Sequence, residues 1–447
     1  MKISALVLAA GEGSRMMSSL PKPLHKIAGY SMIDHVLRAL SSMNIEDVRV
    51  VVGPNMSNLE THIKKINENV HICVQENRYG TADAVKVGMG ANHQDLLVLF
   101  ADTPFIKDIT MHKMQGLLSA DYENTAVVVA GFIAKDSASY GRLIVDNQNG
   151  LEQIIEFLDC DDKQKKIALC NSGIMLINGK YAKGLLEKIK DDNAKKEYYL
   201  TDLVKIARQE KLNCKYIVID ESEAVAVNSR MELSQAEKLI QEKLRDKFIN
   251  NGVTLIDKNT VFFAIDTMIE KDVVIHPNVV FGPKVKICSG TEIKAFSHIE
   301  GAQIGENNVI GPFARIRPGT ETSSDVSIGN FVEIKNSVVR DKTKVNHLSY
   351  IGDAYLGNKV NIGAGAITCN YDGFNKHMTH ILDESFIGSN VSLIAPVSVG
   401  RSSIVAAGSV ITSNVEDNDL AIARVEQRNF VNKALYIRKR KNYNKGS

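Results

Sequence analysis

Glycine and basic residues near the N-terminus form a pattern that can bind phosphate. The apolar run Leu6–Ala10 ends in Gly11-Glu12-Gly13-Ser14-Arg15, and Lys22 follows. Amides of a glycine-rich turn after a strand bind phosphate oxygens, while Arg15 and Lys22 supply positive charge. Met16 stands where the dinucleotide fingerprint and the P-loop both need glycine, so neither motif is present. The turn therefore indicates a nucleotide that is a substrate and not a cofactor.

A second group of charged residues lies in the C-terminal half, around one histidine. His347 lies close in sequence to Arg315, Arg317 and Lys335. If one turn of the fold takes about 18 residues, Arg317, Lys335 and Asp353 stack in one column on strands about 4.8 Å apart. Two cations beside a base that titrates near neutral pH suit an anionic sugar phosphate and a nucleophile that must lose a proton.

The elements that position these residues change character near residue 250. Before it, short apolar runs alternate with helix-like stretches, which predicts an α/β domain with a mostly parallel sheet and its ligands at the carboxyl ends of the strands. After it, apolar residues recur every six residues, the signature of a parallel β-helix. They are Ile269, Ile275, Phe281, Ile287, Ile293 and Ile299, and later Ile387, Leu393, Val399, Val405 and Ile411.

The same patterns predict the domain boundaries. We expect an α/β domain over residues 1–229, a linker helix over 230–250, an all-β coil over 251–437 and a basic tail over 438–447. The linker helix is predicted from an apolar stripe at spacings of three and four residues. The stripe consists of Leu233, Ala236, Ile240, Leu244 and Phe248. Residues 369–376 interrupt the hexads, so they must loop out of the coil.

Composition excludes several classes of partner. A net charge of +2 over 447 residues gives no overall field that would attract nucleic acid or an acidic membrane. No apolar run approaches the ~18 residues that a membrane span needs. The six cysteines are scattered, which favours reduced thiols over disulfides or zinc ligands. We therefore expect a cytoplasmic protein.

The N-terminal motif LVLAAGEGSRM, followed by LPK, resembles the sugar-nucleotidyltransferase family, whose nucleotide-binding domain is Rossmann-like. Further pieces match that family in order over about 230 residues. The resemblance implies Mg²⁺ held by Asp102 and Asn228, with Arg15 and Lys22 acting in catalysis. It implies that the nucleotide sugar contacts Leu8, Ala9, Ala10, Gly11, Lys22, Gln75, Gly80, Thr81, Gly141, Glu156, Asn171 and Asn228.

Two positions depart from this family's pattern. Ala101 replaces the glycine that usually precedes the metal-binding aspartate, a small change. After Glu156 the family commonly has a basic residue, whereas this chain has Phe157-Leu158-Asp159. The loss of that cation puts one phosphate or sugar contact in doubt.

The C-terminal half resembles acyltransferases built on a left-handed parallel β-helix of hexapeptide repeats. The runs GPFARIRPG, GNFVEIK, HLSYIGD and NIGAGAITCNYDG narrow the resemblance to a bifunctional uridylyltransferase/acetyltransferase family, over about residues 3 to 430. In that family His347 is the general base, and the sites lie between subunits of a homotrimer joined through the β-helix. Glucosamine 1-phosphate is then expected to contact Arg317, Lys335, Tyr350, Asn361 and Lys376. Acetyl-CoA is expected to contact Ala364, Asn370, Tyr371, Ser389, Ala407 and Arg424.

The resemblance implies two reactions that make UDP-N-acetylglucosamine, a precursor of the bacterial cell wall. Acetyl-CoA acetylates glucosamine 1-phosphate, and the product attacks UTP with release of pyrophosphate. One alternative is a sugar-nucleotidyltransferase of another specificity with a structural or regulatory β-helix. Another is an assembly subunit with inactive sites. Intact Gly11, Arg15, Lys22 and Asp102 disfavour the latter, and His347 disfavours the former.

Overall fold

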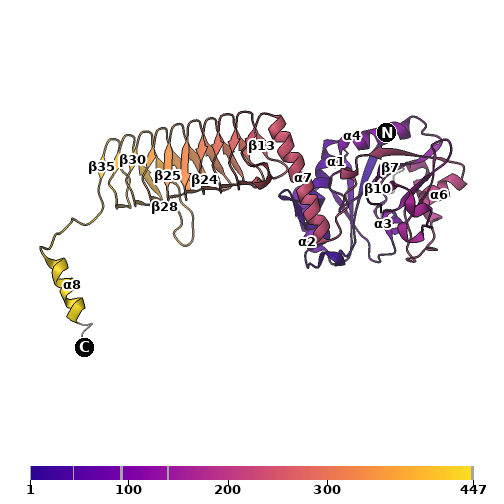
Figure 1. Ribbon diagram of the computed structural model, residues 1–447, viewed down its shortest axis with the longest axis horizontal. Coiled ribbons are helices and arrows are strands. Elements are labelled where there is room, and N and C mark those ends of the chain that lie inside the picture. Colours follow the sequence, from indigo (N-terminus) through magenta and orange to yellow (C-terminus); the bar gives the residue numbers. More distant parts are fainter. Residues whose placement is uncertain (1, 44, 91–93, 138–139, 444–447) are drawn as a thin grey trace. The chain divides into compact units, whose positions relative to one another are not determined.

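The computed structural model of the protein describes residues 2–43, 45–90, 94–137 and 140–443. The chain divides into two compact units, Met1–Lys243 and Leu244–Ser447, which Figure 1 shows as an α/β body and a coil of short strands. Within the described ranges, none of the helices combines the length and apolarity that a membrane crossing requires. All six cysteines are free thiols.

The first unit is built on a mixed sheet with the strand order β11-β7-β10-β6-β1-β4-β5. Strand β10 runs antiparallel to β6 and β7, and the other neighbours along this path are parallel. The strands are β1 (Ile3–Ala9), β4 (Asp47–Val52), β5 (His71–Val74), β6 (Asp95–Phe100), β7 (Thr125–Ile133), β10 (Leu169–Ile177) and β11 (Asn213–Ile219). The hairpin of β8 (Arg142–Val145) and β9 (Leu151–Ile155) joins this sheet through β10, and β2 (Lys26–Ile27) with β3 (Tyr30–Ser31) forms a separate two-stranded sheet.

Helices cover both faces of this sheet. Side chains of a strand alternate between faces, so Ala5 and Val7 enter one core while Leu6 and Leu8 enter the other. The first core is covered by α1 (Met32–Ser42), α2 (Ser57–Ile66) and α4 (Asp108–Ser119). The second is covered by α3 (Thr81–Gly88), α5 (Gly179–Glu187) and α6 (Asp202–Gln209). The predicted α/β architecture is confirmed.

The long helix predicted between the halves is present as α7 (Arg230–Asn250). Four residues of its apolar stripe are buried and Leu233 is half-buried. In the first unit Glu237 accepts a hydrogen bond from the Ala28 amide at 2.8 Å, and in the second Arg245 donates to the Val261 carbonyl at 2.8 Å. Near the C-terminus, α8 (Lys433–Tyr443) includes part of the predicted basic tail, and residues 444–447 lie outside the described residues.

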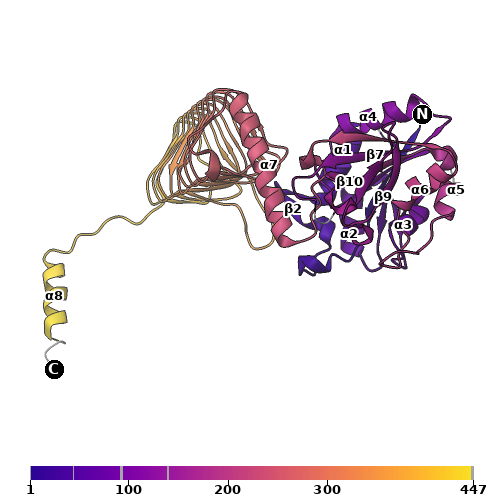
Figure 2. The same cartoon turned by 45° about the vertical axis from the view of Figure 1, so that its right-hand side comes forward.

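Short parallel strands stack into a coil of triangular cross-section, as Figure 2 shows. The hexad residues point into its interior, where all are buried except the half-buried Ile269 in the first turn. The predicted β-helix is thus confirmed. Its strands are β12 (Thr254–Leu255), β13 (Met268–Ile269), β14 (Val274–Ile275), β15 (Val280–Phe281), β16 (Lys286–Ile287), β17 (Glu292–Ile293), β18 (His298–Ile299), β19 (Ala302–Ile304), β20 (Val309–Ile310), β21 (Arg315–Ile316), β22 (Thr320–Thr322), β23 (Ser327–Asn330), β24 (Glu333–Val339), β25 (Lys344–His347), β26 (Tyr350–Leu356), β27 (Asn361–Ile362), β28 (Ile367–Cys369), β29 (Thr379–Ile381), β30 (Phe386–Ile387), β31 (Ser392–Ile394), β32 (Val397–Val399), β33 (Ile404–Val405), β34 (Val410–Ile411) and β35 (Leu420–Ala421).

The register of the coil corrects one expectation. Ile316 pairs with Ile334, which places Arg317 beside Lys335 as predicted. The next turn is one residue shorter, so Lys335 pairs with Gly352 and not with Asp353. A one-residue change moves a side chain to a new position on the coil, because strand residues alternate in direction. The predicted column of Arg317, Lys335 and Asp353 is therefore wrong at its last member.

Adjacent residues of β18 provide a test of the coil's core. Ile299 is fully buried inside it, whereas its neighbour His298 is exposed. We expect Ile299→Ala to lower the free energy of unfolding by about 2–5 kcal/mol because it leaves a cavity. The His298→Ala control should change it by less than about 0.5 kcal/mol. Urea titration of the two full-length variants measures both, and equal losses would contradict the assigned register.

Candidate active sites

Two adjoining cavities lie at the carboxyl ends of the strands in the first unit. They measure ≈ 440 Å³ and ≈ 510 Å³, within the usual size of small-ligand sites. Both are lined by Asp102 and Asn228, while the glycine turn lines the first and Arg15 lines the second. Every residue predicted to contact the nucleotide sugar lines at least one of them. The structure thus brings this whole predicted set together.

Lys22 lies at the centre of the charged residues in these cavities. Its ammonium forms an ion pair with Asp102, and it donates a hydrogen bond to the Asn228 amide oxygen at 3.0 Å. The glycine turn packs directly on this lysine. Gly13 has a φ of 65°, and a Cβ there would lie 2.7 Å from the Lys22 Cβ, so only glycine fits without strain.

The residues around Lys22 also fit a magnesium ion. Oxygen atoms of Asp102 and Asn228 converge on one ammonium group, beside a cavity lined by backbone amides of a glycine turn. Mg²⁺ prefers oxygen ligands and commonly takes one or two from protein and the rest from phosphates and water. Among the described residues there is no cluster of three or more His, Cys, Asp or Glu that could hold a metal. A metal bound here would therefore depend on substrate phosphates.

Gln75 and Thr81 are held in place in the first cavity. The buried Gln75 amide nitrogen donates to the Gly80 carbonyl at 3.2 Å and to Asp83 at 2.7 Å, so its orientation is set. Thr81 begins α3, and its hydroxyl accepts the Leu200 amide at 3.0 Å. Gly80 has a φ of 127°, and a Cβ would lie 2.6 Å from the Tyr198 carbonyl oxygen. This turn therefore requires glycine.

The second cavity holds the residues expected to bind the sugar. The backbone N–H of Asn171 donates a hydrogen bond to the Gly141 carbonyl at 2.8 Å, which connects two of these loops. Glu156 accepts a hydrogen bond from the Thr201 hydroxyl at 3.2 Å. Burial raises the pKa of Glu156, and the Thr201 bond only partly opposes that shift. The site therefore keeps a desolvated carboxyl group that can accept sugar hydroxyls.

In the β-helix, His347 ends β25 and is exposed at a corner of the coil. Its Nδ1 lies 3.1 Å from the side-chain oxygen of Asn330, which is in register with it one turn earlier. Because an amide oxygen can only accept, this contact is a hydrogen bond in the tautomer that carries the proton on Nδ1, which leaves the lone pair of Nε2 to act as a base. This partner orients the ring as a general base requires.

Four of the predicted acetyl-CoA contacts continue along the corner that begins at His347. The Gly365 amide donates to the His347 carbonyl, and the Asn390 amide donates to the Ala364 carbonyl. On the following turns the Gly408 amide bonds to the Ser389 carbonyl, and Arg424 donates to the Ala407 carbonyl at 2.5 Å. These contacts form one ladder on the turns that follow His347, made of Ala364, Ser389, Ala407 and Arg424.

The other predicted residues form a second cluster around Asp353. Its buried carboxylate accepts hydrogen bonds from Asn336, at 2.5 Å, and from Asn370. Burial by itself would raise the pKa of Asp353, but these bonds and the nearby lysines lower it overall. Lys376 lies beside Lys335, and that like charge lowers the pKa of Lys376. Two adjacent ammonium groups form a site for a phosphate.

The remaining predictions are dispersed. Tyr350 lies against Gly352, where a Cβ would be 2.4 Å from the phenol oxygen. Arg317 is paired with Glu333 at 2.7 Å. Asn361 lies in the other sheet of the coil, in register with Lys344, so no contact joins it to Lys335 or Lys376 within the described residues. Tyr371 is exposed on the loop after β28, which projects from the coil in Figure 1.

Comparison with known proteins now identifies the family. Residues 5–153 match the MobA-like NTP transferase domain, and residues 266–301 match the bacterial transferase hexapeptide (six repeats). The chain is 45% identical to the bifunctional protein GlmU of Bartonella bacilliformis, over 99% of this chain and 98% of that protein. It is 46% identical to the GlmU protein of Paramagnetospirillum magneticum, over 95% of this chain and 94% of the relative. The chain belongs to the GlmU family.

Several residues at these GlmU sites escaped the sequence analysis. Arg78 and Lys195 line the first cavity, and Arg78 donates to the Ala10 carbonyl and pairs with Glu12, both at 2.7 Å. These residues lie in polar loops without a motif, so no signal marked them. Asn330 had one signal, its position one turn of the coil before His347.

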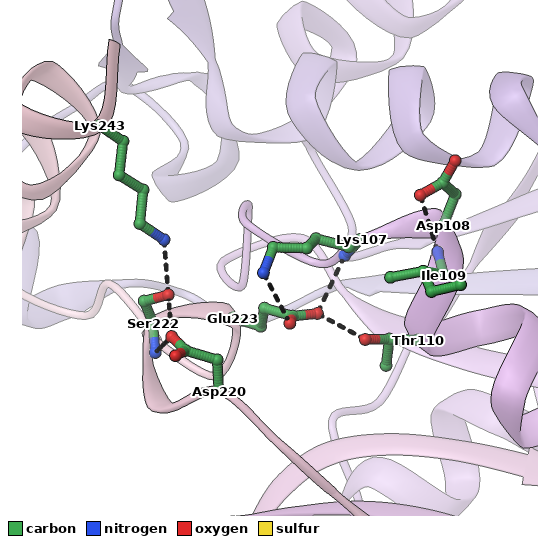
Figure 3. Close-up of polar contacts among 8 residues, drawn as sticks. All are labelled: Lys107, Asp108, Ile109, Thr110, Asp220, Ser222, Glu223 and Lys243. Atoms are coloured by element: carbon green, nitrogen blue, oxygen red, sulfur yellow. Dashed lines mark hydrogen bonds and ion pairs between the residues drawn. The ribbon is translucent and has the colours of Figure 1, made fainter. Parts of the chain in front are cut away.

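Glu223 joins the loop that follows Asp102 to the loop that precedes Asn228. It lies five residues before Asn228, and its partner Lys107 lies five residues after Asp102. The buried carboxylate accepts the Lys107 amide at 3.2 Å and the Thr110 hydroxyl at 2.7 Å, and it pairs with the Lys107 ammonium at 3.1 Å (Figure 3). Beyond it, the Val227 amide donates to the Asp102 carbonyl at 2.9 Å. The two loops are therefore fixed to each other at two levels.

We expect Glu223→Ala to destabilise the first unit, because it leaves the buried Thr110 hydroxyl and the Lys107 amide without an acceptor. The expected loss in the free energy of unfolding is about 2–4 kcal/mol. Ser222→Ala in the same turn should cost less than about 1 kcal/mol, because its partner Lys243 is free to move into solvent. Thermal unfolding compares the two, and a Glu223 loss no greater than the Ser222 loss would exclude this role.

Proposed function

We propose that the chain makes UDP-N-acetylglucosamine in two steps at two sites. The β-helix transfers acetyl from acetyl-CoA to the amine of glucosamine 1-phosphate. The α/β domain then transfers uridylyl from UTP to N-acetylglucosamine 1-phosphate, and pyrophosphate leaves. The observation that carries this proposal is full-length similarity to the GlmU family, together with two separate sets of site residues in one chain.

Acetyl transfer uses His347 as the base. The amine nitrogen attacks the thioester carbonyl while His347 Nε2 accepts a proton from it. The new C–N bond forms, the C–S bond breaks, and the sulfur leaves as the thiol of coenzyme A after taking up a proton. Lys335 and Lys376 hold the substrate phosphate, and Asn330 keeps the imidazole in the tautomer that accepts the proton.

Uridylyl transfer depends on position and charge. A phosphate oxygen of N-acetylglucosamine 1-phosphate attacks the α-phosphorus of UTP in line with the leaving pyrophosphate, so one P–O bond forms as another breaks. Mg²⁺, bound by Asp102 and Asn228, would supply positive charge to the reacting phosphates. Lys22 and Arg15 offset the charge on the nucleotide phosphates, and the glycine turn donates amides to them. Gln75 orients the base, and Glu156 with Asn171 orients the sugar.

The oligomer and the cellular location belong to the same proposal. We expect a homotrimer formed through the β-helix, in a cytoplasmic enzyme. The support is geometric: Asn361 lies in a different sheet of the coil from Lys335, and the loop after β28 exposes Tyr371 and Phe374. A neighbouring subunit would complete a site that one coil leaves open. A purely structural β-helix is disfavoured, because a scaffold has no use for the oriented His347.

Single substitutions should separate the two activities. His347→Ala is expected to lower acetyl transfer by about 10²–10⁴-fold, because the base is lost, and to leave uridylyl transfer unchanged. Asp102→Ala should abolish uridylyl transfer and spare acetylation. Release of free thiol from acetyl-CoA with glucosamine 1-phosphate measures the first activity. Release of pyrophosphate from UTP and Mg²⁺ with added N-acetylglucosamine 1-phosphate, in a separate reaction, measures the second. Equal loss of both activities in either folded variant would refute the two-site proposal.

Glu156→Gln should stabilise the folded protein and lower its uridylyl-transfer activity. Burial raises the pKa of Glu156 in the folded state, so the charged form destabilises folding above that pKa. We expect a higher melting temperature for Glu156→Gln at pH 7, with the difference vanishing below about pH 4, where the carboxyl is protonated in both states. The kcat/KM for N-acetylglucosamine 1-phosphate should fall about tenfold or more. A lower melting temperature at pH 7 would contradict the assigned burial cost.

A further inference from the structure

The segment after Glu156, where the family resemblance implies a basic residue, has the sequence Phe157-Leu158-Asp159 in this chain. Leu158 stands in the segment after Glu156, and its side chain is 63% exposed along the second cavity. An apolar side chain at this place cannot hold a phosphate or a sugar hydroxyl. The substrate nevertheless carries a phosphate that must lie close to the α-phosphate of UTP, where two anionic groups repel each other.

The loop between α5 and α6 lies directly against this segment. Asp159, next to Leu158, accepts a hydrogen bond from the backbone amide of Ala194, next to Lys195, at 3.1 Å. Asn193 holds the turn of this loop, since its side-chain oxygen accepts the amides of Lys195 and Glu197 at 3.2 Å each. Residues 158 and 195 are therefore neighbours in space, although they belong to separate elements.

Lys195 is also placed at the junction of the two cavities. Six residues line both cavities, and Lys195 is the basic one among them. The others are Thr81, Phe100, Asp102, Glu197 and Asn228. The sugar phosphate and the nucleotide must meet at this junction for the phosphorus–oxygen bond to form. A cation placed here acts on both reacting groups at once.

The ammonium of Lys195 is not neutralised by an ion pair. Lys22 is paired with Asp102 and Arg78 with Glu12, whereas Lys195 forms no ion pair with any of the residues that the structure describes. Its charge reaches the sugar subsite, because it opposes the upward shift in the pKa of Glu156. Lys195 thus has a charge directed at the cavity and available to a ligand.

We propose that Lys195 binds the phosphate of N-acetylglucosamine 1-phosphate and replaces the cation missing at position 158. The inference rests on the proposed uridylyl transfer and adds a substrate-binding residue to it. The same phosphate would otherwise have only Arg15 as a basic partner in the second cavity among the described residues.

Steady-state kinetics of pyrophosphate release, with N-acetylglucosamine 1-phosphate varied at saturating UTP and Mg²⁺, test the role. We expect Lys195→Met to lower kcat/KM by about 10- to 100-fold, mainly through a higher KM for the sugar phosphate, while the KM for UTP changes little. Lys195→Arg should keep most of the activity. Lys196→Met is the matched control: this next residue is 74% exposed, pairs with Asp192 and lines neither cavity, so its kcat/KM should equal the wild-type value.

A charge swap provides the sharper test. Adding Leu158→Lys to Lys195→Met should recover at least half of the loss on a logarithmic scale, because the two positions face the same ligand. Acetyl transfer by the same proteins should stay at the wild-type rate, and an unchanged melting temperature should show that the α/β unit of every variant is folded. A Lys195→Met enzyme within twofold of wild type, or a double variant no better than the single one, would overturn the inference. Failure of the wild-type chain to release pyrophosphate would instead refute the proposed function itself.

Discussion

The uridylyl-transfer site depends on one contact, the Lys22 ammonium held between Asp102 and Asn228. It joins three segments that are distant in sequence: the turn after β1, the end of β6 and the loop before α7. The positive charge holds the side-chain oxygens of Asp102 and Asn228 close together in the absence of any ligand, so the proposed binding of phosphate and Mg²⁺ would need little reorganisation. Gly13 supports this arrangement because it permits close packing on Lys22. The hydrogen bonds of Glu223 support it because they fix the loop that follows Asp102 to the loop that precedes Asn228.

The acetyl-transfer site depends on a different constraint, the register of stacked coils. Parallel pairing brings residues one turn apart into ladders, so a histidine, its orienting amide and a row of backbone carbonyls align along one corner without any long-range fold. This alignment depends on the number of residues in each turn of the coil. Because one turn is a residue shorter, Asp353 does not stack on Arg317 and Lys335. It instead accepts hydrogen bonds from the side chains of Asn336 and Asn370. The inserted loop is thereby anchored at its base to the coil.

The basic residues of the two sites have different neighbours. In the α/β domain Lys22 and Arg78 are neutralised by carboxylates, and Lys195 is left with its charge facing the cavity junction. In the β-helix two ammonium groups are brought together, and the neighbouring Lys335 lowers the pKa of Lys376. We propose that both arrangements bind a sugar phosphate, as expected if the product of one site is the substrate of the other.

The sequence by itself determined the architecture and most of the residues predicted here that line the two cavities of the α/β domain. Hexad spacing specified the coil because each sixth side chain must be buried, and the ordered motifs from Gly11 to Asn228 specified a common cavity because parallel strands end at one edge. It could not determine contacts that depend on two segments meeting. Glu223 and Lys195 carry no motif. Glu223 meets Lys107, and the loop of Lys195 meets Asp159, only because the chain folds back on itself. The displacement of Asp353 likewise required the true turn length, because a period read as 18 residues differs from 17 by too little to detect in one turn. Local pattern fixes burial, whereas hydrogen-bond partners from distant segments are decided by the packing of the whole chain.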